Sequence, residues 1–157
     1  MTLLAELRNY SGVLKKKLAV ETFPEFMREI MELKTPPHIL EWADLLERNR
    51  QLVVEASRDH AKSWTFSYAW PLYNLQRHKD PKAAEHIALI SYAEEQAKKN
   101  LVRIRKAIET VPALNWLMPK SKSYSWDAQR LECSNGAMIE AFGFGSSIRG
   151  GHYPRSV

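Results

Sequence analysis

The sequence contains one cysteine, Cys133, among its 157 residues, and no apolar run long enough to cross a membrane. A single cysteine permits no disulfide within the chain and fits a reducing compartment. The first residues lack both a basic leader and a cleavage signature, so the sequence does not predict secretion. Cys133 has no neighbours in the sequence that suit a metal site or a nucleophile, which predicts a small core residue.

Glycine is also scarce: there are six, and four of them, Gly143, Gly145, Gly150 and Gly151, fall within one short segment. Such a concentration predicts a special backbone conformation. Arg149 lies inside this segment, and the planar fork of an arginine can donate to two phosphate oxygens at once. The alternative is an ordinary mobile connection between strands.

Positive charge, in contrast, is plentiful. The 23 Lys and Arg residues outnumber the 18 Asp and Glu residues, which gives a net charge of +5 with neutral histidines. This excess suggests a polyanionic partner without identifying one. The 45% hydrophobic and 26% charged content is that of a soluble globular protein. The length suits one domain, or part of a larger one.

Helical signals dominate the beginning of the chain. The run TFPE at residues 22–25 is a capping box with proline in the first turn, and it predicts a helix that ends near Lys34, before two prolines. Apolar spacing predicts a further helix over residues 38–48.

A strand and another helix are expected next. Residues 51–56 read as a buried strand, and residues 62–70 contain no glycine or proline, so they can form a helix that Pro71 kinks or stops. Several aromatic side chains of this helix share one face and are expected in the core: Phe66, Trp70 and Tyr73.

The pattern then changes to strand, helix and hairpin. Residues 86–91 predict a strand, and residues 91–94 (SYAE) form a second capping box. This box opens a helix that Pro112 ends, with an apolar stripe of Ala93, Ala97, Leu101, Ile104 and Ile108. Asn135-Gly136, flanked by residues 129–134 and 137–142, predicts a hairpin.

The same helix carries a basic face away from its apolar stripe. Such a face can follow a nucleic-acid backbone, or it can be an ordinary solvated helix surface. Its residues are Lys98, Lys99, Arg103, Arg105 and Lys106.

The stretch between the expected strand 51–56 and the helix from Lys62 contains residue types that suit a phosphate-binding loop. A phosphate-binding loop needs inward-turned backbone N–H groups, a lysine for the outer phosphates and a hydroxyl for magnesium. Lys62 and Ser63 supply the last two, and the helix N-terminus adds partial positive charge. The usual pattern has glycine at both ends, whereas this chain has Ala56 and Ala61. An ordinary strand-to-helix turn is the alternative.

Four segments together resemble the large terminase subunit of tailed phages, the motor that packages DNA into capsids. They are SRDHAKS at residues 57–63, FSYAWPL at 66–72, ALISYAEEQA at 88–97 and GSSIRG at 145–150. Their order and spacing are similar to those of the family's ATPase domain from about residue 35 onward. Terminases also tolerate replaced glycines and a basic residue inside the loop.

The resemblance implies a nucleotide site with named roles. Residues Ser57, Arg58, Asp59, His60, Ala61, Lys62 and Ser63 would bind ATP. Lys62 would contact the outer phosphates, Ser63 would ligate Mg²⁺, and Arg58 would be the basic residue of the loop. Arg149 aligns with the arginine that the family presents to a neighbouring subunit's nucleotide, so Lys62 and Arg149 would be the catalytic residues.

The resemblance also assigns regions around this site. Residues 35–42 lie where the family holds the adenine, and residues 91–96 correspond to a helicase-like motif that would couple nucleotide state to DNA. On the basic helix, the candidates for DNA contact are Lys98, Lys99, Arg103 and Lys106.

The implied fold is an α/β P-loop NTPase of the additional-strand ATPase type, a three-layer sandwich. Residues 1–34 would be an N-terminal helical extension and residues 35–157 a partial ATPase domain. The expectation is that the chain is truncated before the acidic Walker B strand. That strand would help to hold magnesium and to orient the attacking water, so hydrolysis by this chain alone is not expected.

The implied partners are double-stranded DNA, other large subunits in a ring, the portal and the small terminase subunit, in the cytoplasm of the infected host, with no membrane. Two alternatives stay open. One is an interaction fragment that needs a partner chain carrying the missing acidic strand. The other is a helicase-like P-loop ATPase that acts on nucleic acid.

Overall fold

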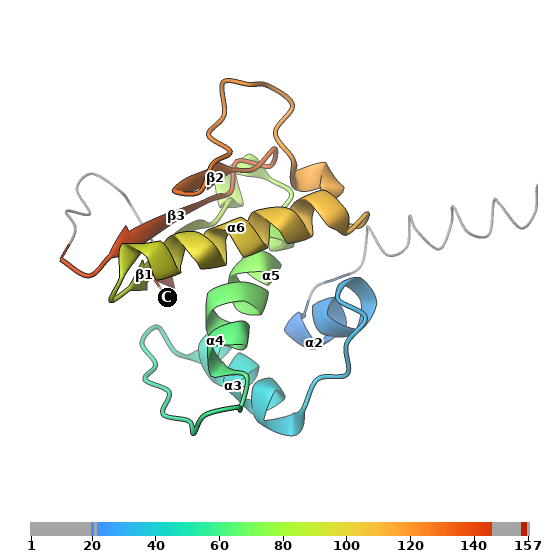
Figure 1. Cartoon of the computed structure of the whole chain (residues 1–157). Coiled ribbons are helices and arrows are strands. Elements are labelled where there is room, and N and C mark those ends of the chain that lie inside the picture. The colour runs from blue at the N-terminus through green and yellow to red at the C-terminus, as the bar shows by residue number, and fades with distance from the viewer. Residues whose placement is uncertain (1–19, 21, 146–154, 157) are drawn as a thin grey trace, which may run out of the picture.

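The computed structural model describes residue 20, residues 22–145 and the backbone of residues 155–156. Its sheet has four strands in the order β2-β3-β1-β4 (Figure 1). β1 pairs in parallel with β3 and with β4, and β2 pairs antiparallel with β3. The strands are β1 (His86–Ser91), β2 (Arg130–Glu132), β3 (Met138–Gly143) and β4 (Arg155–Ser156).

Helices cover more of the described chain than strands do. In Figure 1, α6 lies across the sheet, and the segment between α3 and α4 projects as a loop. The helices are α2 (Phe23–Glu25), α3 (Pro37–Arg48), α4 (Lys62–Trp64), α5 (Trp70–Arg77) and α6 (Glu94–Thr110). Short 3₁₀ turns are η3 (Pro81–Ala83) and η4 (Asn115–Leu117), and wide π turns are η1 (Phe26–Ile30) and η2 (Thr65–Ala69).

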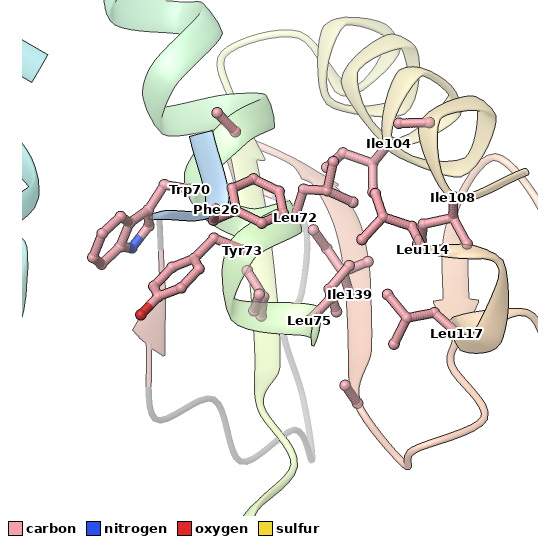
Figure 2. Packing of buried hydrophobic residues seen from close by; sticks show 14 of the residues in the cluster. Phe26, Trp70, Leu72, Tyr73, Leu75, Ile104, Ile108, Leu114, Leu117 and Ile139 are labelled. Carbon is pink, nitrogen blue, oxygen red and sulfur yellow. The ribbon is translucent and has the colours of Figure 1, made fainter. Parts of the chain in front are cut away.

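The core is one continuous cluster of buried side chains from α2 through β3. At one end, Phe23 packs edge-on against Trp70 and Tyr73, with ring centroids 5.2 and 5.6 Å away. Figure 2 shows Trp70 and Tyr73 at this end and Ile108 and Leu117 at the other. Residues on both sides of position 34 therefore share one core. The predicted division into residues 1–34 and 35–157 stays a prediction.

The unit β1–α6–β3 is a parallel crossover with the helix packed on both strands. Burial alternates along β3, so one face of the sheet is covered and the other is partly exposed. At the end of β3, Gly143 lies against α6: a Cβ there would stand 3.0 Å from the Cβ of Glu94. The described chain is thus an α/β structure, whereas the three-layer P-loop arrangement stays a prediction.

The predicted hairpin around Asn135-Gly136 is confirmed. Gly136 has φ +84°, a left-handed conformation that glycine adopts without strain. The Asn135 amide donates to the carbonyls of Leu75 (2.8 Å) and His78 (2.7 Å), at the end of α5. Cys133 is fully buried beside this turn, and burial raises the pKa of its thiol to about 12, which confirms a core role.

The strand predicted over residues 51–56 is wrong. This segment forms no strand, and Val53 is 89% exposed. The residues Leu52-Val53-Val54 have high strand propensity, but propensity forms a strand only where a neighbouring strand is available to pair with it. In the described structure β1 has β3 and β4 as its neighbours instead.

Two local predictions also need correction. α6 forms as predicted, but the second capping box does not. Ser91 belongs to β1, and the N-cap is Ala93, whose side chain makes no capping hydrogen bond. Of the two effects predicted for Pro71, a kink or a stop, the stop does not occur: α4, η2 and α5 continue from Lys62 to Arg77. The π turn before Pro71 relaxes the hydrogen-bond pattern that a proline ring otherwise disrupts.

The helix predicted from the first capping box is shorter than expected. The box itself forms, with Thr22 and Glu25 each accepting from the other's backbone N–H. The following turns end at Ile30 rather than near residue 34. Glu32, just beyond them, adopts a left-handed conformation with φ +54°, which cannot continue a right-handed helix.

Candidate functional site

The loop before α4 is exposed and has an unusual backbone. Asp59 and Ala61 adopt left-handed conformations with φ of +66° and +55°, whereas His60 and Lys62 beside them do not. Where left-handed residues alternate with right-handed ones, successive backbone N–H groups can turn toward one side and bind an anion. The second alanine that replaces glycine in the motif therefore has a conformation that favours glycine.

A helix starts directly at Lys62. Ala61 is its N-cap and offers no side-chain cap, and the first intrahelical bond runs from Thr65 N to Ala61 O at 2.8 Å. The N–H groups of the first turn therefore lack intrahelical acceptors, and the helix dipole adds positive potential there. Within the described residues, neither the Lys62 ammonium nor the Ser63 hydroxyl has a hydrogen-bond partner. Both groups are thus available to a phosphorylated ligand or to magnesium.

Side chains within the loop hold its shape. The Nδ1 atom of His60 lies 2.9 Å from the Ser57 hydroxyl and 3.0 Å from the Arg58 carbonyl oxygen. The loop is therefore held as a turn by one imidazole ring.

A row of rings connects the loop to α3. The ring centroids of His60 and His38 are 5.8 Å apart, those of His38 and Trp42 are 5.1 Å apart, and those of Trp42 and Phe66 are 5.4 Å apart. The row brings the predicted adenine region at residues 35–42 beside the predicted phosphate loop. Such flat apolar surfaces can stack with a base. Phe66 thus contacts α3 and is only half-buried, whereas Trp70 and Tyr73 fill the core as predicted.

The four predicted DNA contacts on α6 have different surroundings. Lys98 Nζ lies 2.7 Å from a Glu94 carboxylate oxygen, and this hydrogen bond raises the pKa of Lys98 above its usual value. Arg103 stacks over the Tyr68 ring, with its Cζ 4.2 Å from the centroid. Lys99 and Lys106 are exposed. The basic face therefore leaves Lys99 and Lys106 in solvent, while Arg103 also links α6 to η2.

The link involves a partly buried phenol. Burial raises the pKa of Tyr68, and the nearby charge of Arg103 opposes that rise. Trp64, one turn earlier, packs at 5.7 Å from Tyr68 between ring centroids. The helix that begins at the loop is thus attached to α6 through the cation–π contact of Arg103 with Tyr68, and Trp64 packs against the same tyrosine.

Arg149, the predicted second catalytic residue, lies outside the described residues. Two hollows, of about 330 and 470 Å³, adjoin α2 and α3, and neither includes a residue of the loop. In the part of the chain that the structure describes, no group of three His, Cys, Asp or Glu side chains could hold a metal ion. The helices of that part are all too short or too polar to cross a membrane.

Replacing Ala61 with glycine is expected to stabilise the protein by about 0.5–1 kcal/mol. The left-handed conformation strains an alanine by roughly 1–2 kcal/mol, and the greater freedom of glycine in the unfolded chain offsets only part of that relief. Urea unfolding measures the change. Ala56→Gly is the matched control, because Ala56 is not left-handed, and there the free energy of unfolding should fall slightly. Equal effects at the two positions would contradict the strain at Ala61.

The sequence predicted the loop at residues 57–63 but not the row of rings beside it. His38 and Trp42 stand four residues apart, a spacing that places both on one face of a helix, and this was the available signal. The contact of His38 with His60 joins segments about 20 residues apart, which helical periodicity does not reveal. No protein-family model, curated protein or solved structure matches the chain, so the site is described from its geometry.

Proposed function

We propose that this chain is the ATP-binding part of a large terminase subunit, the motor that packages viral double-stranded DNA into a procapsid. Residues 57–63 would hold the phosphates of ATP, with Lys62 on the outer phosphates. Ser63 would ligate Mg²⁺, which binds few protein groups beside phosphate oxygens. Bound magnesium would neutralise charge that develops on the phosphates.

One observation carries the proposal: a helix begins at Lys62 immediately after a left-handed Ala61, and its first turn is uncapped. Backbone N–H groups then lie within two consecutive residues together with an ammonium and a hydroxyl that have no partner among the described residues. Each of these favours an anion or its metal ion, and together they are the groups that triphosphate binding requires.

The rings beside the loop support the same proposal. A nucleotide whose phosphates occupy the loop would need a flat apolar surface near it for the base. The His38 and Trp42 rings supply one, through the contact between His38 and His60. ATP is therefore a better match than a simple phosphate ester.

The motor's other parts belong to the same proposal. Double-stranded DNA would follow the basic face of α6, where Lys99 and Lys106 are exposed. Copies of the subunit would form a ring in which Arg149 of one copy reaches the nucleotide of the next. The portal and the small terminase subunit would complete the assembly, in the cytoplasm of the infected host.

Isothermal titration of the chain with ATP and Mg²⁺ tests the proposal. The wild type should give a binding signal, and Lys62→Ala should weaken binding at least tenfold, because it removes the ammonium that contacts the outer phosphates; tenfold corresponds to about 1.4 kcal/mol. Lys120→Ala, which removes an exposed lysine of a different loop, is the control and should bind as the wild type does. Equal affinities for the Lys62→Ala variant and the wild type would exclude the proposed site.

A further inference from the structure

The His60 side chain contacts both parts of the candidate site, the loop and the row of rings. Its Nδ1 atom lies 2.9 Å from Ser57 Oγ and 3.0 Å from the carbonyl oxygen of Arg58. Its ring packs edge-on against His38, at an interplanar angle of 65°. His60 is also exposed, so it is not required to fill a core.

The partners of His60 determine where its hydrogen lies. A backbone carbonyl oxygen can only accept a hydrogen bond, so at 3.0 Å from Arg58 O the Nδ1 atom must carry a hydrogen and donate it. The Ser57 oxygen then accepts a share of the same hydrogen. The ring therefore acts on the loop as a donor.

This donation orients one peptide group of the loop. The peptide between Arg58 and Asp59 is planar and trans, so its C=O and N–H point in opposite directions. Because the carbonyl is held toward the His60 ring, the N–H of Asp59 is held away from it. A carbonyl oxygen that turned toward a phosphate would repel it, and the imidazole prevents that rotation.

We infer that His60 is a positioning residue that holds the loop 57–63 in its anion-binding conformation before the phosphates arrive. The inference rests on the proposed function and adds to it a role for the His60 side chain, which acts on the loop backbone. Preorganisation of this kind raises affinity because the loop is not ordered at the moment of binding.

Three substitutions of His60 separate a positioning role from a general structural one. His60→Asn keeps a side-chain nitrogen bonded to Cγ, where Nδ1 stands, so it can still donate to Arg58 O. His60→Gln moves that nitrogen one bond farther out, and His60→Ala removes it. The Gln and Ala variants should bind Mg²⁺-ATP about five- to tenfold more weakly than the wild type, the effect of one hydrogen bond, and Asn should stay within about twofold.

Titration with tripolyphosphate provides the second readout. The hydrogen bond from His60 holds the phosphate loop, so the Gln and Ala variants should lose affinity for tripolyphosphate by the same factor as for ATP. A loss confined to ATP would assign His60 to the base and overturn the inference. Because His60 is exposed, urea unfolding midpoints of all three variants should match the wild type. A shared drop in those midpoints, with Asn as weak as Gln, would show a structural role and also overturn it.

The titration of the wild type separates a failure of the proposed function from a failure of the positioning role of His60. If wild type binds neither ATP nor tripolyphosphate, the proposed function fails, and the inference fails with it. If wild type binds both and all three variants bind equally well, the proposed function stands and the positioning role of His60 is excluded.

Discussion

Replacing Asn135 with alanine is expected to lower the free energy of unfolding by about 3 kcal/mol. The buried amide of Asn135 donates to the carbonyls of Leu75 and His78, 2.8 and 2.7 Å away, and its oxygen accepts from the Ala137 N–H. Asn135 thereby connects the hairpin to the end of α5, across about 60 residues of sequence. Alanine would leave the carbonyl groups without this donor in a place that water does not easily reach.

Urea unfolding followed by circular dichroism measures the loss. Asn49→Ala is a matched control, because Asn49 also donates its amide to a carbonyl near a helix end, that of Leu45 at 2.8 Å, but in an exposed position. Water can replace that bond, so the control should lose less than about 0.5 kcal/mol. Similar losses in the two variants would show that Asn135 does not tie the hairpin to α5.

Replacing Phe23 with alanine should cost about 3–5 kcal/mol, the usual range for a buried phenylalanine. Phe23 is 2% exposed, and its ring contacts those of Phe26, Trp70 and Tyr73. The substitution would leave a cavity between α2 and α5, and the rings around it would lose their edge-on contacts.

This experiment also tests the predicted boundary at residue 34. If residues 22–30 belong to the common core, a single cooperative transition should shift to lower urea concentration. If they form a separate extension, Phe23→Ala should leave the main transition in place. Phe144→Ala is the control, since that ring is 80% exposed and its loss should change the midpoint little.

The elements that the sequence predicted correctly carry their signals locally. α6 forms because its apolar residues recur every three to four positions, and Ala97, Leu101, Ile104 and Ile108 of that stripe are buried. β1 occupies the predicted residues 86–91. The hairpin follows from the backbone freedom of Gly136. In each case the decisive information lies within about ten consecutive residues.

The failures depend on information from elsewhere in the chain. Residues 51–56 have the composition of a strand, but whether they pair depends on which strands flank β1. Ser91 has the right spacing for a capping box, yet its backbone is extended as part of β1. Pro71 lies inside a continuous helix because the turn before it is widened, and no composition rule predicts such a turn.

The candidate site divides in the same way. The phosphate and magnesium roles of Lys62 and Ser63 stay predictions. The helix start at Lys62 was recognisable from residues 62–70, which contain no glycine or proline. The contact of His60 with His38 was not, because it depends on how α3 packs beside the loop. The sequence did not predict the left-handed backbone of Ala61, since this conformation is expected at a glycine rather than at an alanine.

The π turn at Thr65–Ala69 sets the rotational phase between the loop and the core. A π turn accommodates an extra residue, and each residue of an α-helix turns the chain by about 100°. Through this part of the helix, Phe66 contacts Trp42 of α3 and Trp70 contacts Phe23 of α2. Were this turn to tighten into a regular α-helix while α5 stayed packed, Lys62 would swing about a quarter of a revolution around the helix axis. Such a change in winding would reorient the loop while α5 stayed in the core.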